Sequence, residues 1–285
     1  MSSAHHVRGA LYLLAAEFLF CCMDALIKFL STALPSETIV FFRNLLALLL
    51  LLPWIARRGG VNMAWSALRF HLLRSASGIA AMYCAFIALA HLPLAETTVL
   101  RSTTPLFIPL IAWLWLGEPV SHTARFALAL GFLGILLILR PGLAVFSPMA
   151  LVALTSGLLA AVAMTTIRRL AGLASSSEIV FYFSLMGTLL SLLPLTWGWQ
   201  TPSAMQLAGL LLMGALATSA QLLLTRAYTC APAVELAPYV YSTVLFSSLL
   251  GWMLWGERLD GPGWLGAALV ALAGVSVVRA ARWRA

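Results

Sequence analysis

The chain has 285 residues, of which 62% are hydrophobic and only 9% charged, and its formal net charge is +8. A soluble domain has about a quarter of its residues charged, so this composition excludes a water-soluble globule. The basic residues are scattered between apolar runs and form no patch, which excludes nucleic acid as the expected partner. The composition predicts an integral membrane protein that is embedded in a lipid bilayer.

Apolar segments of about 20 residues, the length that crosses roughly 30 Å of hydrocarbon, follow one another with short connections. The run after Arg8 lacks a small-residue cleavage site, so it is interpreted as a first helix and not as a signal peptide. No glycine-rich loop that could hold ATP phosphates is visible. We expect ten membrane helices, at residues 9–30, 37–55, 69–90, 95–116, 123–139, 147–167, 178–197, 204–227, 234–255 and 262–278.

One stretch of the chain occurs twice. The sequence PLAETTVLRSTTPLFIPLIAWLWLGE begins at Pro93, and PAVELAPYVYSTVLFSSLLGWMLWGE begins 139 residues later, at Pro232. Both copies share the first proline, a glutamate three residues on and the final Gly-Glu pair. We therefore predict two repeats of five helices, residues 1–140 and 141–285. Because five is an odd number, the second repeat must enter the membrane in the opposite orientation.

The lysines and arginines are distributed as an inverted repeat requires. Arg57 and Arg58 follow the second helix, with Arg69 and Arg74 just beyond, whereas the corresponding segment at 197–206 has no basic residue. With both termini in the cytoplasm, twelve basic residues lie inside, three outside and two within helices. This positive-inside asymmetry predicts a multi-pass protein of the cytoplasmic (inner) membrane.

The first predicted helix carries Glu17, Cys21, Asp24 and Lys28 at spacings that place them on one face. A charge at the bilayer centre costs at least ~2.5–3.5 kcal/mol, so these side chains must face protein or water. Asp24 and Lys28 either neutralise each other one turn apart or contact the ammonium or carboxylate of a substrate. Glu17 has no partner nearby in the sequence and is a candidate for substrate contact or proton binding.

Arg101 lies in the fourth predicted helix, on one face with Thr97 and Thr104. Pro105 has no N–H, so it leaves the carbonyl of Arg101 without its usual donor. A free carbonyl and a cation in mid-membrane are tolerated only beside another polar group or cavity water. Arg101 is therefore a candidate substrate-binding residue, and the alternative is a buried network with an acid of the first helix.

Four further polar residues are candidate substrate contacts. Tyr239 and Ser242 share a face of the ninth predicted helix, and Tyr83 and Gln221 lie in the third and eighth. Tyrosines would form apolar walls with hydroxyl tips, suited to a substrate of mixed polarity. The alternative is helix packing or, for Gln221, a helix–helix hydrogen bond worth ~0.6 kcal/mol. Arg43 is interpreted as an interhelical partner for an acid.

Several stretches together resemble the EamA type of the drug/metabolite transporter superfamily. They are FFRN at 41–44, PLAETTVLRSTTPLF at 93–107, the turns LGEP at 117–120 and WGER at 256–259, and the repeat itself. The resemblance implies an all-α membrane protein whose ten helices surround a central cavity, with the fifth and tenth packed outside. It also implies transport of amino acids, nucleotide-like metabolites, vitamins or drugs.

We therefore expect a secondary transporter that exports small metabolites, amino acids first among them, by alternating access and as a monomer. Uptake or exchange of S-adenosylmethionine or a nucleotide-like metabolite is the alternative. The cysteines and histidines show no metal or disulfide spacing, and no catalytic constellation is suggested, so we expect no enzyme, no cofactor and no metal. The charged face of the first helix disfavours a mere scaffold.

Overall fold

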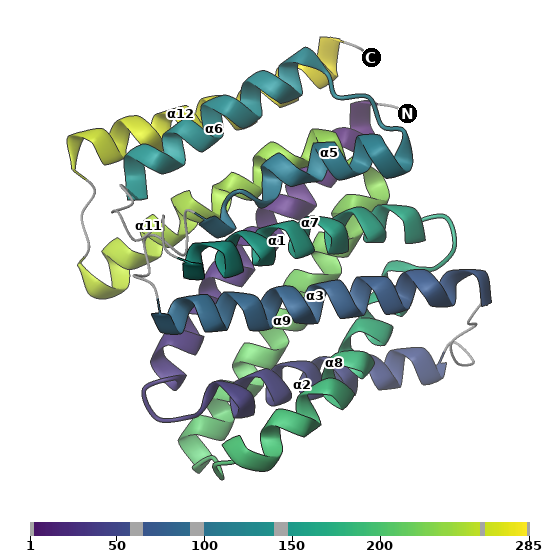
Figure 1. Cartoon of the computed structure of the whole chain (residues 1–285), viewed down its shortest axis with the longest axis vertical. Coiled ribbons are helices and arrows are strands. Elements are labelled where there is room, and N and C mark those ends of the chain that lie inside the picture. The colour runs from purple at the N-terminus through teal and green to yellow at the C-terminus, as the bar shows by residue number, and fades with distance from the viewer. Residues whose placement is uncertain (1–2, 58–64, 92–99, 140–147, 257–259, 284–285) are drawn as a thin grey trace.

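The computed structural model describes residues 3–57, 65–91, 100–139, 148–256 and 260–283 (Figure 1). Within these ranges all regular structure is helical, so the predicted all-α class is confirmed for the described residues. Each of the ten predicted segments corresponds to one long helix or helical run. The helices are α1 (Ser3–Leu30), α2 (Ser36–Arg57), α3 (Trp65–His91), α5 (Thr104–Leu116), α6 (His122–Leu139), α7 (Pro148–Leu170), α8 (Ser176–Gly198), α9 (Ala204–Cys230), α10 (Ala233–Leu236), the 3-10 turn η2 (Ala237–Tyr241), α11 (Ser242–Trp255) and α12 (Gly261–Trp283).

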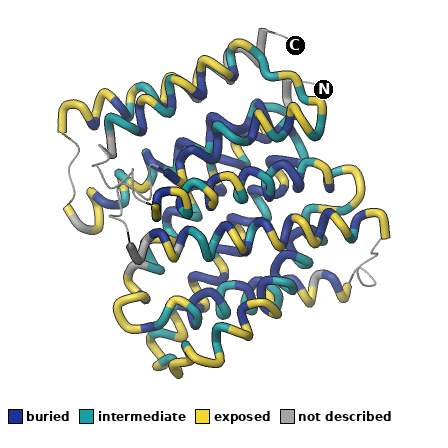
Figure 2. The backbone as a smooth tube through the Cα atoms, viewed as in Figure 1, coloured by how far each residue is buried: buried dark blue, intermediate teal, exposed yellow. Residues whose placement is uncertain are grey.

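Among the described residues, six helical runs are long and apolar enough to cross a membrane: α1, α2, α7, α8, α9 and the run from α10 to α11. Helices α5, α6 and α12 contain shorter apolar stretches. Many backbone positions of the helices are exposed (Figure 2). Large apolar side chains are among the exposed residues, for example Trp113, Leu193 and Met205. Exposed apolar surface on this scale is stable in lipid and unfavourable in water.

Two predicted helices are interrupted. The segment predicted at 95–116 has a turn at Ser102 and Thr103, and α5 begins only at Thr104; residues 95–99 lie outside the described part. The segment predicted at 234–255 is divided into α10, η2 and α11. The physical reason is the same in both, because Pro105 and Pro238 cannot donate a backbone hydrogen bond. The prolines therefore interrupt both predicted helices within their apolar runs.

The helices pack in long pairs. Helix α1 lies along α9, α3 along α7, α2 along α8, and α6 along α12, while α5 contacts α7 and α11 contacts α1. Every one of these pairs joins a helix before residue 140 to a helix after it. Figure 1 shows α6 and α12 side by side at one edge of the bundle, where the fifth and tenth helices were expected. Each half of the chain thus buries its apolar faces mainly against the other half.

Two glycines end helices that occupy equivalent places in the two halves. Gly117 ends α5 and Gly256 ends α11, both in the left-handed conformation with φ of 68° and 70°. A residue with a Cβ is strained in this conformation, which explains why glycine stands there. The predicted turns at the two Gly-Glu pairs are confirmed as far as these glycines, since Glu257 lies outside the described residues.

Helices α6 and α12 approach each other closely at Gly134. A Cβ atom at this position would lie 2.6 Å from the carbonyl oxygen of Gly266 and 2.9 Å from Val270. Glycine therefore lets two backbones meet, as small residues do at helix interfaces in membranes. Gly131, on the same helix, lies against the ring of Tyr241 in η2.

We predict that Gly134→Leu lowers the free energy of unfolding by about 1–3 kcal/mol, because the new side chain overlaps the α12 backbone. Thermal unfolding of the detergent-purified protein measures the effect. Gly172→Leu is the matched control, since a Cβ at Gly172 meets no atom within 4 Å. Equal unfolding temperatures of the two variants would contradict the described contact between α6 and α12.

Candidate functional site

The polar face of α1 is divided between buried and open positions. Glu17 is buried with 6% exposure, and Cys21 is buried against α11. The Cys21 thiol donates to the carbonyl oxygen of Thr243 at 3.3 Å and lies 3.4 Å from the Ser247 hydroxyl. Asp24, one turn further, is exposed although it lies within the apolar helix. Helix α1 thus packs on α11 at Cys21 and leaves the Asp24 carboxylate facing open space.

Asp24 and two arginines from other segments form a charged group. The carboxylate of Asp24 is attracted by the guanidinium groups of Arg101 and Arg43. Arg101 is exposed and Arg43 is half-buried. Within the described residues none of the three forms an ion pair shorter than 4.0 Å. Opposite charges that attract without touching leave room between them for a polar ligand or water.

The break before α5 is held together by threonine hydroxyls. Thr104 donates to the carbonyl oxygen of Arg101 at 2.7 Å, and Thr103 donates to that of Leu100 at 2.6 Å. Both threonines are buried and lie against Gly157 of α7. The hydroxyl of Thr104, which was predicted to contact a substrate, therefore donates to the very carbonyl that Pro105 leaves free. Its donor function here is structural.

The remaining predicted residues are mostly enclosed between helices. Gln221, Tyr239 and Ser242 are buried, and the Ser242 hydroxyl has no hydrogen-bond partner within the described part of the chain. Tyr83 is half-buried, and its hydroxyl likewise has no partner there. Only Glu17, Asp24 and Arg101 are brought into one electrostatic group. Thr97 and the side chain of Lys28 lie outside the described residues, so the predicted Asp24–Lys28 pair stays a prediction.

Helix α3 carries buried polar groups that sequence reasoning missed. Arg74, which was counted among the cytoplasmic basic residues, is only 5% exposed, and its guanidinium lies 4.1 Å from the ring centre of Phe183. His71 is buried and stacks on Tyr182 at 4.4 Å between ring centres. Arg74 Nε, His71 Nδ1 and the Ser75 hydroxyl have no partner in the described structure. The sequence signal that could have identified this group is the spacing of residues 71, 74 and 75, which places them on one face of an apolar helix.

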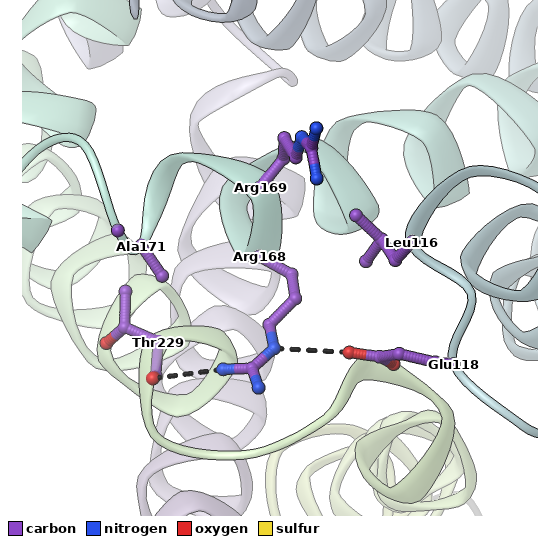
Figure 3. Close-up of a pocket in the computed structure, with 7 residues that line it drawn as sticks. Leu116, Glu118, Arg168, Arg169, Ala171 and Thr229 are labelled. Carbon is purple, nitrogen blue, oxygen red and sulfur yellow. Dashed lines mark hydrogen bonds and ion pairs between the residues drawn. The ribbon is translucent and has the colours of Figure 1, made fainter.

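A second polar group lies at the ends of α7 and α9 (Figure 3). There Arg168 points toward Glu118, with 3.2 Å between Nε and Oε1, and donates to the carbonyl oxygen of Thr229 at 3.2 Å. Glu118 also accepts from the backbone N–H of Val234. Glu118, Arg168 and Thr229 border an open pocket of about 420 Å³. The connection after α5 is thereby tied to the ends of α7 and α9 and the start of α10.

A match to a known protein family covers both halves of the chain. The profile of the EamA-like transporter family matches residues 7–140 and again residues 147–279. The chain belongs to the EamA-like transporter family. Within the described residues no three His, Cys, Asp or Glu side chains gather where they could hold a metal ion.

Named relatives of this EamA-like chain span nearly its whole length. It is 34% identical to the pseudopaline exporter CntI of Pseudomonas aeruginosa, over 95% of this chain and 96% of the relative. It is 30% identical to a riboflavin transporter of Vibrio cholerae, covering 95% and 93%. An S-adenosylmethionine uptake transporter of Rickettsia felis is 25% identical, covering 90% and 87%. The chain is a multi-pass membrane protein and a small-molecule transporter.

The same fold is found in a solved crystal structure. It superposes with a TM-score of 0.84 and covers 99% of both chains, at 18% sequence identity. At that identity the likeness concerns the fold alone. It supports the arrangement of helices from which the charged group around Asp24 is built.

For this EamA-like transporter we predict that Arg168→Gln lowers the free energy of unfolding by about 1–2 kcal/mol. The change removes a charged donor from Glu118 and from the Thr229 carbonyl, and the value is discounted for partial exposure. Thermal unfolding in detergent measures it. Arg169→Gln is the matched control, because Arg169 is exposed and points away from Glu118 (Figure 3). A loss of stability as large in the control as in Arg168→Gln would contradict the structural role of the pair.

Proposed function

We propose that this EamA-like protein is a secondary transporter that exports small zwitterionic metabolites, amino acids first among them, across the cytoplasmic membrane. The observation that carries the proposal is the separated pair of Asp24 and Arg101, both exposed although they lie within apolar segments. A carboxylate suits the ammonium of a zwitterion, and a planar guanidinium suits its carboxylate. Intramembrane charges of this kind are functional by default.

The proposed mechanism is alternating access by an inverted five-plus-five repeat, residues 1–140 and 141–285, acting as a monomer. In the proposed repeat, α1, α3 and α5 of the first half correspond to α7, α9 and α11 of the second. If each helix is replaced by its counterpart, the α1–α9 pair becomes the α7–α3 pair and the α5–α7 contact becomes the α11–α1 contact, and all four are observed. The left-handed glycines at 117 and 256 and the double family match support the same symmetry. Two arrangements related by such a pseudo-symmetry supply the inward-open and outward-open states.

The Glu118–Arg168 contact lies on the cytoplasmic side in the proposed orientation. It links the connection after α5, in the first repeat, to α7, in the second. Opening toward the cytoplasm must separate these repeats, so the contact has to break in that state. His6 and Glu235, whose Nε2 and Oε2 atoms are 2.8 Å apart, add a second link between the same two repeats.

Uptake of S-adenosylmethionine or a nucleotide-like metabolite is the second candidate. The observation that favours it is the set of relatives named for S-adenosylmethionine uptake and riboflavin transport. Because the named relatives are named for different substrates, membership of the family does not identify the substrate of this chain. The substrate class is therefore inferred from the charges around Asp24. Those charges favour a zwitterion over a neutral substrate.

The orientation is testable with single cysteines in a background without the four native ones. Both Arg57, at the end of α2, and Gln200, between α8 and α9, are exposed. We predict that a membrane-impermeant maleimide added to intact cells labels Gln200→Cys and spares Arg57→Cys until the membrane is opened. Labelling of both from the same side would remove the inverted repeat.

The transport role is testable with purified protein in proteoliposomes, using a panel of labelled amino acids with and without a pH gradient. We predict that Arg101→Lys reduces flux about tenfold or more, because lysine cannot reproduce the planar fork of donors. Glu17→Gln should fold and shift the pH profile, because only the carboxylate titrates. Arg125→Lys is the control, since Arg125 is exposed and bonded locally to His122.

Normal flux, substrate preference and pH profile in folded Arg101→Lys and Glu17→Gln would exclude the site. If Glu17 belonged to a buried structural pair, Glu17→Gln would instead strand the charge of its partner and cost about 3–5 kcal/mol of stability, whereas Arg101→Lys keeps its charge and would fold normally. Unfolding measurements on the same preparations separate the two results. S-adenosylmethionine belongs in the panel, and its flux in place of that of amino acids would favour the second candidate.

A further inference from the structure

The buried arginine of α3 is held at a defined place. The Arg74 guanidinium lies over the Phe183 ring, and a Cβ at Gly78 would overlap the Arg74 Nη1 atom and lie 3.0 Å from that ring. Glycine at 78 and the flat ring of Phe183 thus form a slot that fits a planar cation. The Nε atom of Arg74 nevertheless has no hydrogen-bond partner in the described structure.

A second arginine, Arg43, lies in α2 next to a residue that packs on α8. Asn44 packs on Gly187, where a Cβ would lie 2.7 Å from the Asn44 side chain. Gly187 and Phe183 are four residues apart, so they lie one turn apart on one face of α8. Arg43 precedes Asn44, and its positive charge is close enough to Arg74 for the two to repel each other. Two like charges therefore meet inside an apolar bundle.

The carboxylates that the structure describes near helix α3 act on groups other than Arg74. Glu178 acts electrostatically on His71, and Glu37 acts on Tyr83. Asp24 attracts Arg43 and Arg101, while the charge that acts on Arg74 comes from Arg43. A buried cation beside another cation is costly unless an anion joins them. Since the neighbouring side chains supply none to Arg74, a ligand can.

We propose that Arg43 and Arg74 form an anion subsite that binds a second carboxylate of the substrate. The inference rests on the proposed function and narrows it: the ammonium group faces Asp24, one carboxylate faces Arg101, and a further carboxylate lies between Arg43 and Arg74. The substrate is then an amino acid or a related metabolite with one more carboxylate than amines. Two guanidinium forks bind a carboxylate through several charged hydrogen bonds, so the extra group is recognised and not merely tolerated.

The test uses matched probes that differ by one negative charge: glutamate against glutamine, and aspartate against asparagine, at equal ionic strength. Binding to the detergent-purified full chain is measured by the shift of its unfolding midpoint against probe concentration, which needs no membrane. We expect the acid of each pair to bind about tenfold or more tightly than its amide.

Variants then assign that preference to the two arginines. Arg43→Gln and Arg74→Gln should each abolish it, and Arg74→Lys, which keeps a charge without the fork, should reduce it. Arg57→Gln, at the exposed end of α2, should keep it. Each midpoint is compared with that of the same variant without probe, so a change in stability cancels. If Arg74→Gln does not fold, Arg43→Gln and Arg74→Lys still decide the matter.

Equal binding of acid and amide by the unmodified protein would overturn the proposal. So would an acid preference that persists in both Arg43→Gln and Arg74→Gln, because the second carboxylate would then bind elsewhere. Absence of amino-acid flux in proteoliposomes is a different result. It would contradict the proposed transport function, whereas the preference for acids over amides is read from binding alone.

Discussion

The structure depends on a constraint that water-soluble proteins escape: every backbone polar group inside a bilayer needs a partner within the protein. Pro105 breaks this rule at the Arg101 carbonyl, and the hydroxyl of Thr104 restores it at 2.7 Å. The repair leaves a turn before α5 that an unbroken helix could not contain. Arg101 stands at that turn with its side chain exposed. A local backbone defect thus creates the position from which a cation can face the middle of the protein.

The charged interior follows from the same shortage of water. Asp24 attracts Arg43 and Arg101, which lie on two other segments, and none of the three reaches ion-pair distance in the described structure. If they touched, they would satisfy one another and leave little for a ligand. Separation keeps each side chain available at the cost of a less stable empty state. A stable empty site and a strong binding site are competing demands.

Much of this was accessible from the sequence, because apolar length and the spacing of charged residues are local properties. The ten helical segments, the turns at Gly117 and Gly256, and the isolation of Glu17, Asp24 and Arg101 in apolar runs were all predicted. Pro105 was expected to disturb the backbone at Arg101, but the turn at Ser102 and Thr103 and the 3-10 turn η2 were not located from the sequence. Arg74 was misplaced because an arginine six residues into a predicted helix looks interfacial by distance along the chain. Only the packing of α3 against α8 shows it buried on Phe183.

The pairing of α1 with α9 and α11 has a consequence for synthesis. Cys21 meets Thr243, which is 222 residues further along the chain. At ~5–20 residues per second a ribosome needs about 10–45 s to make that interval. During this time the first helix is in the membrane with Glu17 and Asp24 but without the helices that cover them. The nascent chain therefore passes through a stage in which its acids face lipid, the translocon or an insertion factor, long before the site exists.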